Sequence, residues 1–198
     1  MKLSTILVHI DNGHMALPEF QRGYVWNRDQ VRGLMQSLYR GYPVGSLLVW
    51  ATGSDDAEVR GDQTPAVGVV KLLLDGQQRI TSLYGIIRGK APAFFDGNAQ
   101  AFTGLYFHVG NEAFEFYSAQ KMEADPLWVD VTAVMKGGIG GLSSFHSRLL
   151  HHSEYLARIM EFAGRLTRLL AIVEADFHIE EVTDALATGG ESPIDVVV

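Results

Sequence analysis

Five consecutive residues, Asp75-Gly76-Gln77-Gln78-Arg79, combine a carboxylate, a glycine, two amides and a guanidinium. They follow the apolar run from Val67 to Leu74, which indicates a buried strand, and they precede residues with helical spacing. A helix that begins here points unpaired backbone N–H groups and partial positive charge at this turn, and phosphate binds readily to such groups. Because Gly76 lets the backbone approach a ligand closely, the segment is predicted to be the polar functional site, and a nucleotide-phosphate site fits it best.

The side chains of this segment suit the same chemistry. Arg79 offers a planar fork for phosphate oxygens, while Gln77 and Gln78 can orient a water or hold a base. Asp75 can polarise a water or bind Mg²⁺, and Thr81 adds a hydroxyl on the first helical turn. The plainer alternative is that Asp75 is only the helix N-cap and that Arg79 pairs with a surface carboxylate. The glycine spacing and lysine of a P-loop are missing, so that class of NTPase is not indicated.

A second group of chemistry-bearing residues lies in the segment Leu17–Trp26, where proline, glycine and aromatic residues predict an extended loop. Its aromatic residues can form a pocket that stacks a base or encloses an apolar group, with Arg22 on a phosphate. The alternative is that the aromatics are core residues that tether the loop. Arginines on or beside the following helix form either a DNA-facing stripe or a solvated helix face. The candidate DNA-binding residues are Pro18, Phe20, Gln21, Arg22, Tyr24, Trp26, Arg28 and Arg32.

The composition bounds what these residues can do. The chain has 198 residues, 47% hydrophobic and 20% charged, as expected for one globular domain. It has no cysteine, which excludes disulfides, thiolate metal sites and a cysteine nucleophile. The histidines are scattered, so no histidine metal site is predicted. No apolar run reaches the roughly 20 residues of a membrane-spanning helix, and no secretory signal is evident, so a cytoplasmic location is the default expectation.

The charge is unevenly distributed along the chain. A net charge of −7 argues against nonspecific binding to nucleic acid. Residues 1–90, however, hold 10 Lys/Arg against 8 Asp/Glu, whereas residues 91–198 hold 6 against 15. Any contact with phosphate is therefore expected in the first half and must be local. The plainer explanation is that the acidic half keeps the protein soluble.

Hydrophobic spacing and breakers predict the elements that position these residues. A core of residues 1–135 is expected to precede a helical part of residues 142–198, in a sequence that belongs to a longer chain. The expected elements are a strand or short helix at Leu3–Ile10, a helix capped by Asn27 and closed by Gly41 and Pro43, strands at 45–50 and 67–74, a surface loop at 51–66, a helix from Gln78 to about Gly89, a hairpin at 105–117, a helix capped by Ser153, a strand at 171–177 and a helix from Ile179 to Gly189-Gly190.

Two segments together carry a family resemblance. Leu17–Trp26 and the later segment Leu74–Leu83, which contains the Asp-Gly-Gln-Gln-Arg motif, resemble the N-terminal domain of the GmrSD-type family. That family includes modification-dependent restriction proteins and the SspE proteins of phosphorothioate-based phage defence. The resemblance is strong over residues 17–90 and weaker beyond them. The turn Thr188–Pro193 resembles the family's asparagine-containing turn, but Ala187 or Thr188 stands where asparagine is expected.

The resemblance implies a ParB/sulfiredoxin-like α+β fold, with a small mixed sheet, flanking helices and a helical C-terminal part. It also implies NTP binding and hydrolysis at Asp75–Arg79, with Asp75, Gln78 and Arg79 as catalytic residues. The family couples this site to sensing of modified DNA and to a C-terminal HNH-type nuclease, which these residues do not contain. Sulfiredoxin activity itself is excluded because it requires a cysteine. The rival hypothesis is a non-enzymatic DNA-binding module whose Asp-Gly-Gln-Gln-Arg turn contacts DNA directly.

Overall fold

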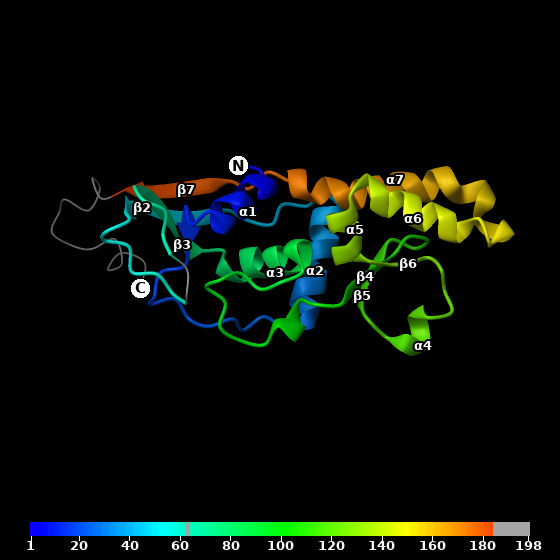
Figure 1. Ribbon diagram of the computed structural model, residues 1–198, viewed down its shortest axis with the longest axis horizontal. Coiled ribbons are helices and arrows are strands. Elements are labelled where there is room, and N and C mark those ends of the chain that lie inside the picture. Colours follow the sequence, from blue (N-terminus) through cyan, green and yellow to red (C-terminus); the bar gives the residue numbers. More distant parts are fainter. Residues whose placement is uncertain (62–63, 184–198) are drawn as a thin grey trace.

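The computed structural model describes residues 1–61 and 64–183 (Figure 1). Its described residues form α-helices, short 3₁₀-helices and two small sheets. The helices are α1 Leu3–Asp11, α2 Arg28–Tyr39, α3 Gln77–Arg88, α4 Ala119–Met122, α5 Val131–Gly137, α6 Ile139–Leu149 and α7 Ile159–Leu170, with 3₁₀-helices at Ala99–Ala101, Ser153–Arg158 and Ala171–Glu174. The strands are β1 Met15–Ala16, β2 Leu47–Gly53, β3 Val69–Asp75, β4 Leu105–His108, β5 Ala113–Phe116, β6 Trp128–Asp130 and β7 Ile179–Thr183.

The first sheet is mixed and has the strand order β1-β3-β2-β7. Strands β2 and β3 are antiparallel, whereas β1 runs parallel to β3 and β7 runs parallel to β2. The predicted buried strand is β3, in which Val70, Leu72 and Leu73 are at most 1% exposed. It ends at Asp75, and α3 begins two residues later at Gln77. The strand end therefore fixes where the first turn of α3 meets the surface.

The second sheet is antiparallel, with the order β5-β4-β6, and it lies with α5, α6 and α7 at the other end of the elongated molecule (Figure 1). Its buried face carries Phe107, Phe114 and Val129. Helix α3 runs between the two sheets in Figure 1. Most of its residues are buried, including Ile80 and Leu83, which face the core. The predicted α+β class, with a small mixed sheet and flanking helices, is confirmed.

Several local predictions are confirmed. Asn27 caps α2 in a complete capping box with Gln30, and the helix ends at Tyr39, just before the predicted breakers. The hairpin forms as β4 and β5. The ambiguous segment Leu3–Ile10 is helical, and its apolar residues at positions i, i+3, i+4 and i+7 are buried. No helix among the described residues is both long and apolar enough to span a membrane.

Other predictions are wrong. The segment predicted as a strand at 171–177 begins with a 3₁₀-helix, Ala171–Glu174, and Ile179 begins strand β7 rather than a helix. Strand β2 continues to Gly53, into the predicted loop. The helix predicted from Ser153 starts as 3₁₀, and α7 begins only at Ile159. Edge pairing explains β7, because the open edge of β2 supplies its backbone partners and overrides local preference. The predicted turn Thr188–Pro193 and the helix end at Gly189-Gly190 lie outside the described residues.

Candidate functional site

The two segments singled out in the sequence lie against each other. The turn between β3 and α3 and the loop Gln21–Trp26 enclose a surface cavity of about 190 Å³. Both segments contribute side chains to its wall. The lining residues are Gln21, Arg22, Trp26, Leu74, Asp75, Gly76, Gln77, Gln78 and Arg79. Two segments that lie about 50 residues apart in the sequence therefore meet in the folded chain. The cavity between them is the candidate site.

The first turn of α3 opens onto this cavity without a side-chain cap. Its N-cap is Gly76, with φ 95°, so the predicted alternative in which Asp75 serves as the N-cap does not describe this helix. A Cβ on residue 76 would overlap the Cδ2 methyl of Leu47, and the left-handed backbone itself favours glycine. The uncapped N–H groups and the helix dipole make this end of the cavity attractive to an anion.

The two glutamines of the motif hold the neighbouring loop. The Gln77 amide donates to the Arg22 carbonyl oxygen at 2.7 Å. The Gln78 oxygen accepts from the backbone N–H groups of Val25 at 2.9 Å and Trp26 at 3.2 Å, and its amide donates to Gly23 at 3.3 Å. Both glutamines are buried. Since buried amides need their partners, these side chains position the loop, and the bonds of Gln78 use most of its hydrogen-bonding capacity.

A reciprocal bond ties the loop back to the strand. The Gln21 amide donates to the Leu74 carbonyl oxygen at 2.8 Å, where β3 approaches its end. Arg60, which lies in the predicted polar loop, also donates to the Gln21 carbonyl oxygen and pairs with Asp96 at 3.4 Å. The sequence reasoning missed Arg60, because a lone arginine in a loop carries no spacing signal. The loop backbone is therefore fixed from both sides.

Arg79 forms hydrogen bonds to a third segment, Val44–Ser46. Its Nη1 donates to the Val44 carbonyl oxygen, and its Nη2 donates to Ser46 at 2.7 Å and to the Asp75 carboxylate at 3.1 Å. The Arg79 side chain is only 15% exposed, while Asp75 is 73% exposed. Gly45, with φ +84°, leaves the space that the guanidinium fills. The fork of Arg79 is thus engaged largely within the protein, and Asp75 is the acidic group that faces solvent.

These hydrogen bonds of Arg79 give a first testable prediction. Arg79→Lys should lower the free energy of unfolding by about 2–3 kcal/mol, because one ammonium cannot replace a fork that bonds two carbonyls and a carboxylate. Urea denaturation measures the change. The matched control is Arg32→Lys, whose exposed pair with Asp29 should contribute less than about 1 kcal/mol. Equal denaturation midpoints for the two variants would show that the fork geometry is not needed.

Not all predicted DNA-binding aromatics line the cavity. Trp26 lines it and is half-buried, but the Tyr24 hydroxyl bonds the Ser82 hydroxyl at 2.7 Å, and its ring packs on Phe95 and Phe102. Burial raises the pKa of the Tyr24 phenol, so it stays protonated at neutral pH. For Tyr24 the geometry matches the alternative of a core residue that tethers the loop. Phe20, at 52% exposure, faces solvent.

The remaining predicted residues lie away from the cavity. Arg28 donates to the Gln100 carbonyl oxygen at 3.2 Å and stacks over Phe116, while Arg32 pairs with Asp29 at 2.9 Å. Pro18 is buried and bridges to Val59. Thr81 is buried below the turn. The DNA-binding face on α2 that includes Arg28 and Arg32 stays a prediction.

Few side chains near the cavity could bind a metal ion. Among residues 1–61 and 64–183 no three His, Asp or Glu side chains come together as a metal-binding group. Asp75 alone could contribute a carboxylate to Mg²⁺, which accepts one protein ligand when phosphate oxygens and waters supply the others. A magnesium ion at this site would therefore be held mainly by its nucleotide.

Comparison with known proteins identifies the family of this chain. Residues 3–155 match the family described as "GmrSD restriction endonuclease, N-terminal domain". The chain belongs to this GmrSD N-terminal domain family. The resemblance inferred from the two motifs is thus confirmed, and the matched family is described as the N-terminal domain of a restriction endonuclease.

A curated relative matches a shorter part of this chain than the family does. The uncharacterised protein MJ0686 of Methanocaldococcus jannaschii is 35% identical over 82 residues. The match spans 36% of this chain but only 14% of that protein. The chain thus spans a small part of this relative's length, and its name adds no activity.

Proposed function

We propose that this GmrSD N-terminal domain binds and hydrolyses a nucleoside triphosphate and senses modified DNA. The observation that carries the proposal is the uncapped first turn of α3, which opens onto a cavity shared with the loop Gln21–Trp26. Phosphate oxygens would accept from the N–H groups of this turn, which no side-chain cap occupies among the described residues. The family's role in restriction supports a DNA partner for the adjoining loop.

The size of the cavity indicates which part of the nucleotide it can enclose. About 190 Å³ is below the roughly 300–1,000 Å³ of sites that enclose a whole small molecule. The cavity therefore suits the phosphates, while base and ribose lie on the rim beside Trp26. Arg22 lines the cavity and has no ion-pair partner among the described residues, so its guanidinium is available to phosphate oxygens. Mg²⁺, bound with the phosphates, would neutralise part of their charge.

The remaining roles follow from exposure and bonding. Asp75 accepts from Arg79 through one oxygen and is otherwise open to solvent, so it can orient the attacking water and accept its proton. Arg79 is a positioning residue, because it holds this carboxylate and the Val44–Ser46 segment together. Gln77 and Gln78 position the loop. This division refines the expectation that Arg79 and Gln78 act on the phosphates directly.

The same bonds offer a route for coupling to DNA. A ligand that shifts the first turn of α3 changes the positions of Gln77 and Gln78, and both hold the loop backbone. The exposed apolar side chains of Val25 on that loop and of Phe20, which directly precedes it, suit a weakly hydrated group, such as the sulfur of a phosphorothioate. Coupling through this contact must be reciprocal, so that nucleotide alters DNA affinity by the factor by which DNA alters nucleotide affinity.

Hydrolysis tests the proposal. Asp75→Ala should lower kcat by about 100-fold or more, because it removes the group that accepts the proton of the water. The matched control is Asp55→Ala in the exposed loop after β2, which should leave turnover unchanged. Turnover is measured for both variants with phosphorothioate-modified and unmodified duplexes, and only the modified duplex should change it. Equal turnover by Asp75→Ala and the parent protein would refute the catalytic assignment.

The size of the cavity is also compatible with the rival, a non-enzymatic module. A cavity of phosphate size fits a DNA backbone phosphate as well as a nucleotide phosphate. The two hypotheses differ in thermal stability, since a ligand of the folded state must raise the melting temperature. A rise with NTP and Mg²⁺ supports the nucleotide site, and no rise with any NTP supports direct DNA contact. A C-terminal nuclease domain or partner, expected from the family, is likewise a proposal for this chain.

A further inference from the structure

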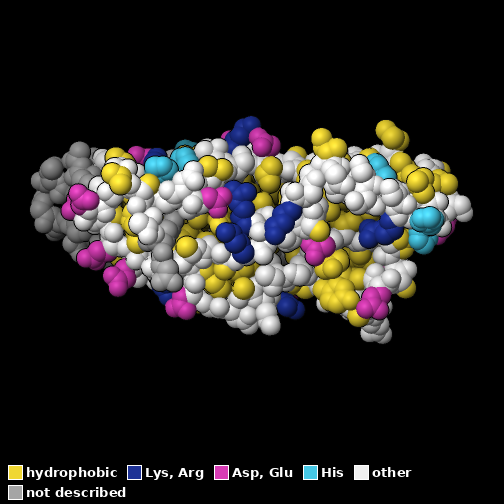
Figure 2. All heavy atoms as spheres, viewed as in Figure 1, with side chains coloured by type: hydrophobic (Ala, Val, Ile, Leu, Met, Phe, Trp, Pro, Cys, Tyr) yellow, Lys and Arg dark blue, Asp and Glu magenta, His cyan; other side chains and the backbone are white. Residues whose placement is uncertain are grey.

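A second open hollow lies between the second sheet and helices α5 and α6. Its volume of about 640 Å³ is within the roughly 300–1,000 Å³ of sites that enclose a small molecule. Figure 2 shows hydrophobic side chains gathered on this face beneath α5 and α6, with Lys or Arg side chains beside them. None of the residues that line the hollow lines the cavity at Asp75, so the two are separate.

Two aromatic rings form the wall on the side of the sheet. Tyr106 on β4 pairs in register with Asp130 on β6, and Trp128 lies two residues before Asp130 on the same strand. Because side chains alternate along a strand, these three point to one face, and the buried Phe107 and Val129 point to the other. Tyr106 and Trp128 both line the hollow, so a flat ring that enters it can stack on them.

The orientation of the Trp128 ring is fixed by His108. The two rings meet edge to face, with their centroids 4.8 Å apart. The His108 Nδ1 accepts from the Asn111 N–H at 3.0 Å, so its Nε2 carries the proton and donates to the Asp125 carboxylate at 2.9 Å. These bonds hold the imidazole, and the imidazole limits the movement of the indole. The stacking surface is therefore formed before a ligand binds.

Two charged side chains that line the hollow retain hydrogen-bonding capacity. Asp130 caps α5 through one carboxylate oxygen, which accepts from the Ala133 N–H at 2.9 Å. Arg148 on α6 donates from Nη2 to the Trp128 carbonyl oxygen at 3.0 Å, and its guanidinium lies over the Phe145 ring. Neither charged side chain has an ion-pair partner in the part of the chain that the structure describes. The second Asp130 oxygen and the remaining Arg148 N–H groups are therefore available to a ligand.

The spacing and the charges of these two groups suit a heterocyclic base. Arg148 bonds β6 at Trp128, and Asp130 lies two residues further, about 7 Å along the strand. Their charges are opposite, so the hollow favours a neutral ligand that has both a donor edge and an acceptor edge. Tyr106 adds a third polar group. Burial, with the Asp130 charge acting in the same direction, raises the pKa of the Tyr106 phenol, so its hydroxyl stays protonated.

Glycines keep the helix side of the hollow free of side chains. Gly137 ends α5, and Gly140 is the second residue of α6. A Cβ at either position would meet no atom within 4 Å, and neither residue has a positive φ. Because glycine lowers helix stability relative to alanine, neither packing nor backbone conformation accounts for glycine at these positions. Both glycines line the hollow, where they leave room for a ligand.

Guanine matches this set of groups. Its O6 and N7 accept from an arginine, its N1–H and amino group donate to a carboxylate, and its faces stack on aromatic rings. Adenine presents an amino group where guanine has O6, and an arginine cannot donate to that group. We propose that the hollow binds the base of a guanine nucleoside, stacked on Tyr106 and Trp128 and held at its edges by Arg148 and Asp130.

Isothermal titration calorimetry with guanosine tests the site, because this probe carries no phosphate and does not report on the cavity at Asp75. The parent protein should bind guanosine at least about tenfold more tightly than adenosine, the difference expected for one arginine–base pair. Trp128→Ala should weaken guanosine binding by about tenfold through lost stacking. Asp130→Asn keeps a residue type that caps helices but loses the charged acceptor, and it should weaken guanosine binding by about tenfold. Arg148→Gln should reduce the preference for guanosine over adenosine.

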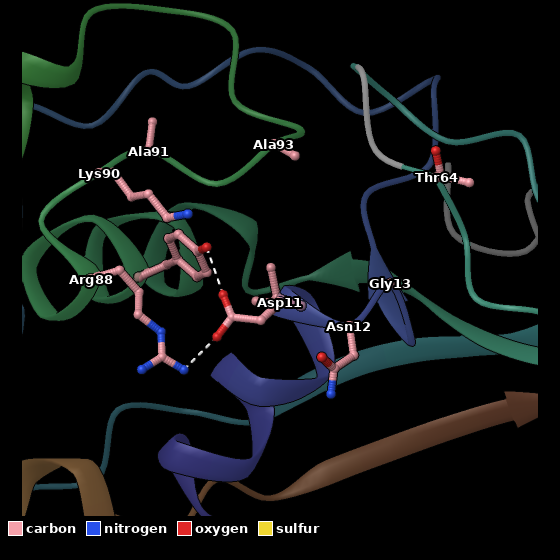
Figure 3. A pocket seen from close by; sticks show the side chains of 10 residues that line it. Asp11, Asn12, Gly13, Thr64, Arg88, Lys90, Ala91 and Ala93 are labelled. Carbon is pink, nitrogen blue, oxygen red and sulfur yellow. Dashed lines mark hydrogen bonds and ion pairs between the residues drawn. The ribbon is translucent and has the colours of Figure 1, made fainter.

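A larger hollow at the C-terminal end of α3 provides the matched control. Its volume is about 810 Å³, and Figure 3 shows Asp11, Arg88 and Lys90 on its wall. The Asp11 carboxylate already accepts from the Tyr84 hydroxyl at 2.7 Å and from Arg88 at 2.5 Å, as the dashed lines show. Lys90→Gln alters this larger hollow and should leave guanosine affinity unchanged.

Further arms separate a free nucleoside from guanine within DNA. The paired charges of the hollow give no excess positive charge for a DNA backbone, so guanosine should bind at least as tightly as a guanine-containing single-stranded oligonucleotide. Arg22→Ala, which alters the cavity at Asp75, should leave guanosine binding intact, so the two proposals can fail independently. Unchanged melting temperatures show that the variants are folded. The proposal is overturned if guanosine does not bind the parent, if adenosine binds equally well, if folded Trp128→Ala and Asp130→Asn bind guanosine like the parent, or if only the oligonucleotide binds.

Discussion

Gln78→Ala should lower the free energy of unfolding by about 2–4 kcal/mol and abolish NTP hydrolysis. The substitution removes three hydrogen bonds to the loop backbone, at Gly23, Val25 and Trp26, and leaves partly buried groups without partners. With the loop released, Arg22 and Trp26 no longer face the first turn of α3. Urea denaturation and a hydrolysis assay on the same preparation measure the two effects.

Two further variants test whether the lost hydrogen bonds of Gln78 cause the loss of stability. Gln78→Glu keeps an acceptor for the Val25 and Trp26 N–H groups but cannot donate to Gly23, so its stability should lie between those of the parent and Gln78→Ala. Gln120→Ala, at an exposed position of α4, should change stability by less than about 0.5 kcal/mol. If Gln78→Ala were as stable and active as Gln120→Ala, the amide would not hold the loop.

Gly76→Ala should destabilise the protein by about 2–4 kcal/mol and remove the anion site. A non-glycine residue in the left-handed region costs about 1–2 kcal/mol, and the new Cβ would overlap the buried Leu47 side chain. The turn can relieve both only by moving the first N–H groups of α3 away from the cavity. Thermal or urea denaturation measures the loss, and NTP-dependent stabilisation measures the anion site.

A matched glycine gives the opposite expectation. Gly33 lies on the exposed face of α2, and a Cβ there would meet no atom within 4 Å. Gly33→Ala should therefore stabilise the protein by about 0.5–1 kcal/mol, because it removes backbone freedom from the unfolded chain. Destabilisation of equal size by Gly33→Ala and Gly76→Ala would contradict the role of the left-handed turn.

The elements that could be predicted are those whose signals are local. Asn27 with Gln30 specifies the start of α2, and the apolar run before Asp75 specifies β3. Strand β7 could not be predicted, because Ile179–Thr183 is extended only where it meets the edge of β2, about 130 residues earlier. The 3₁₀-helix at Ala171–Glu174 cannot be told from a strand by its sequence, because a short apolar run has no distinguishing period.

The candidate site shows the same division. The structure brings the two segments that carry the paired motifs together around one cavity. Sequence types alone could not show that Gln77, Gln78 and Arg79 direct their polar groups at the protein's own backbone. Likewise, Arg28 finds a partner 72 residues away at Gln100, which no helical-face pattern reveals.

The central claim is that the first turn of α3 binds the phosphates of a nucleotide. Backbone amide NMR of the uniformly ¹⁵N-labelled protein, titrated with a non-hydrolysable NTP and Mg²⁺, tests it most directly. The largest saturable shifts should occur at Gly76–Arg79 and spread to Gln21–Trp26 through the glutamine bonds. Shifts that leave Gly76–Arg79 unchanged, whether or not amides at the other end of α3 respond, would contradict the claim.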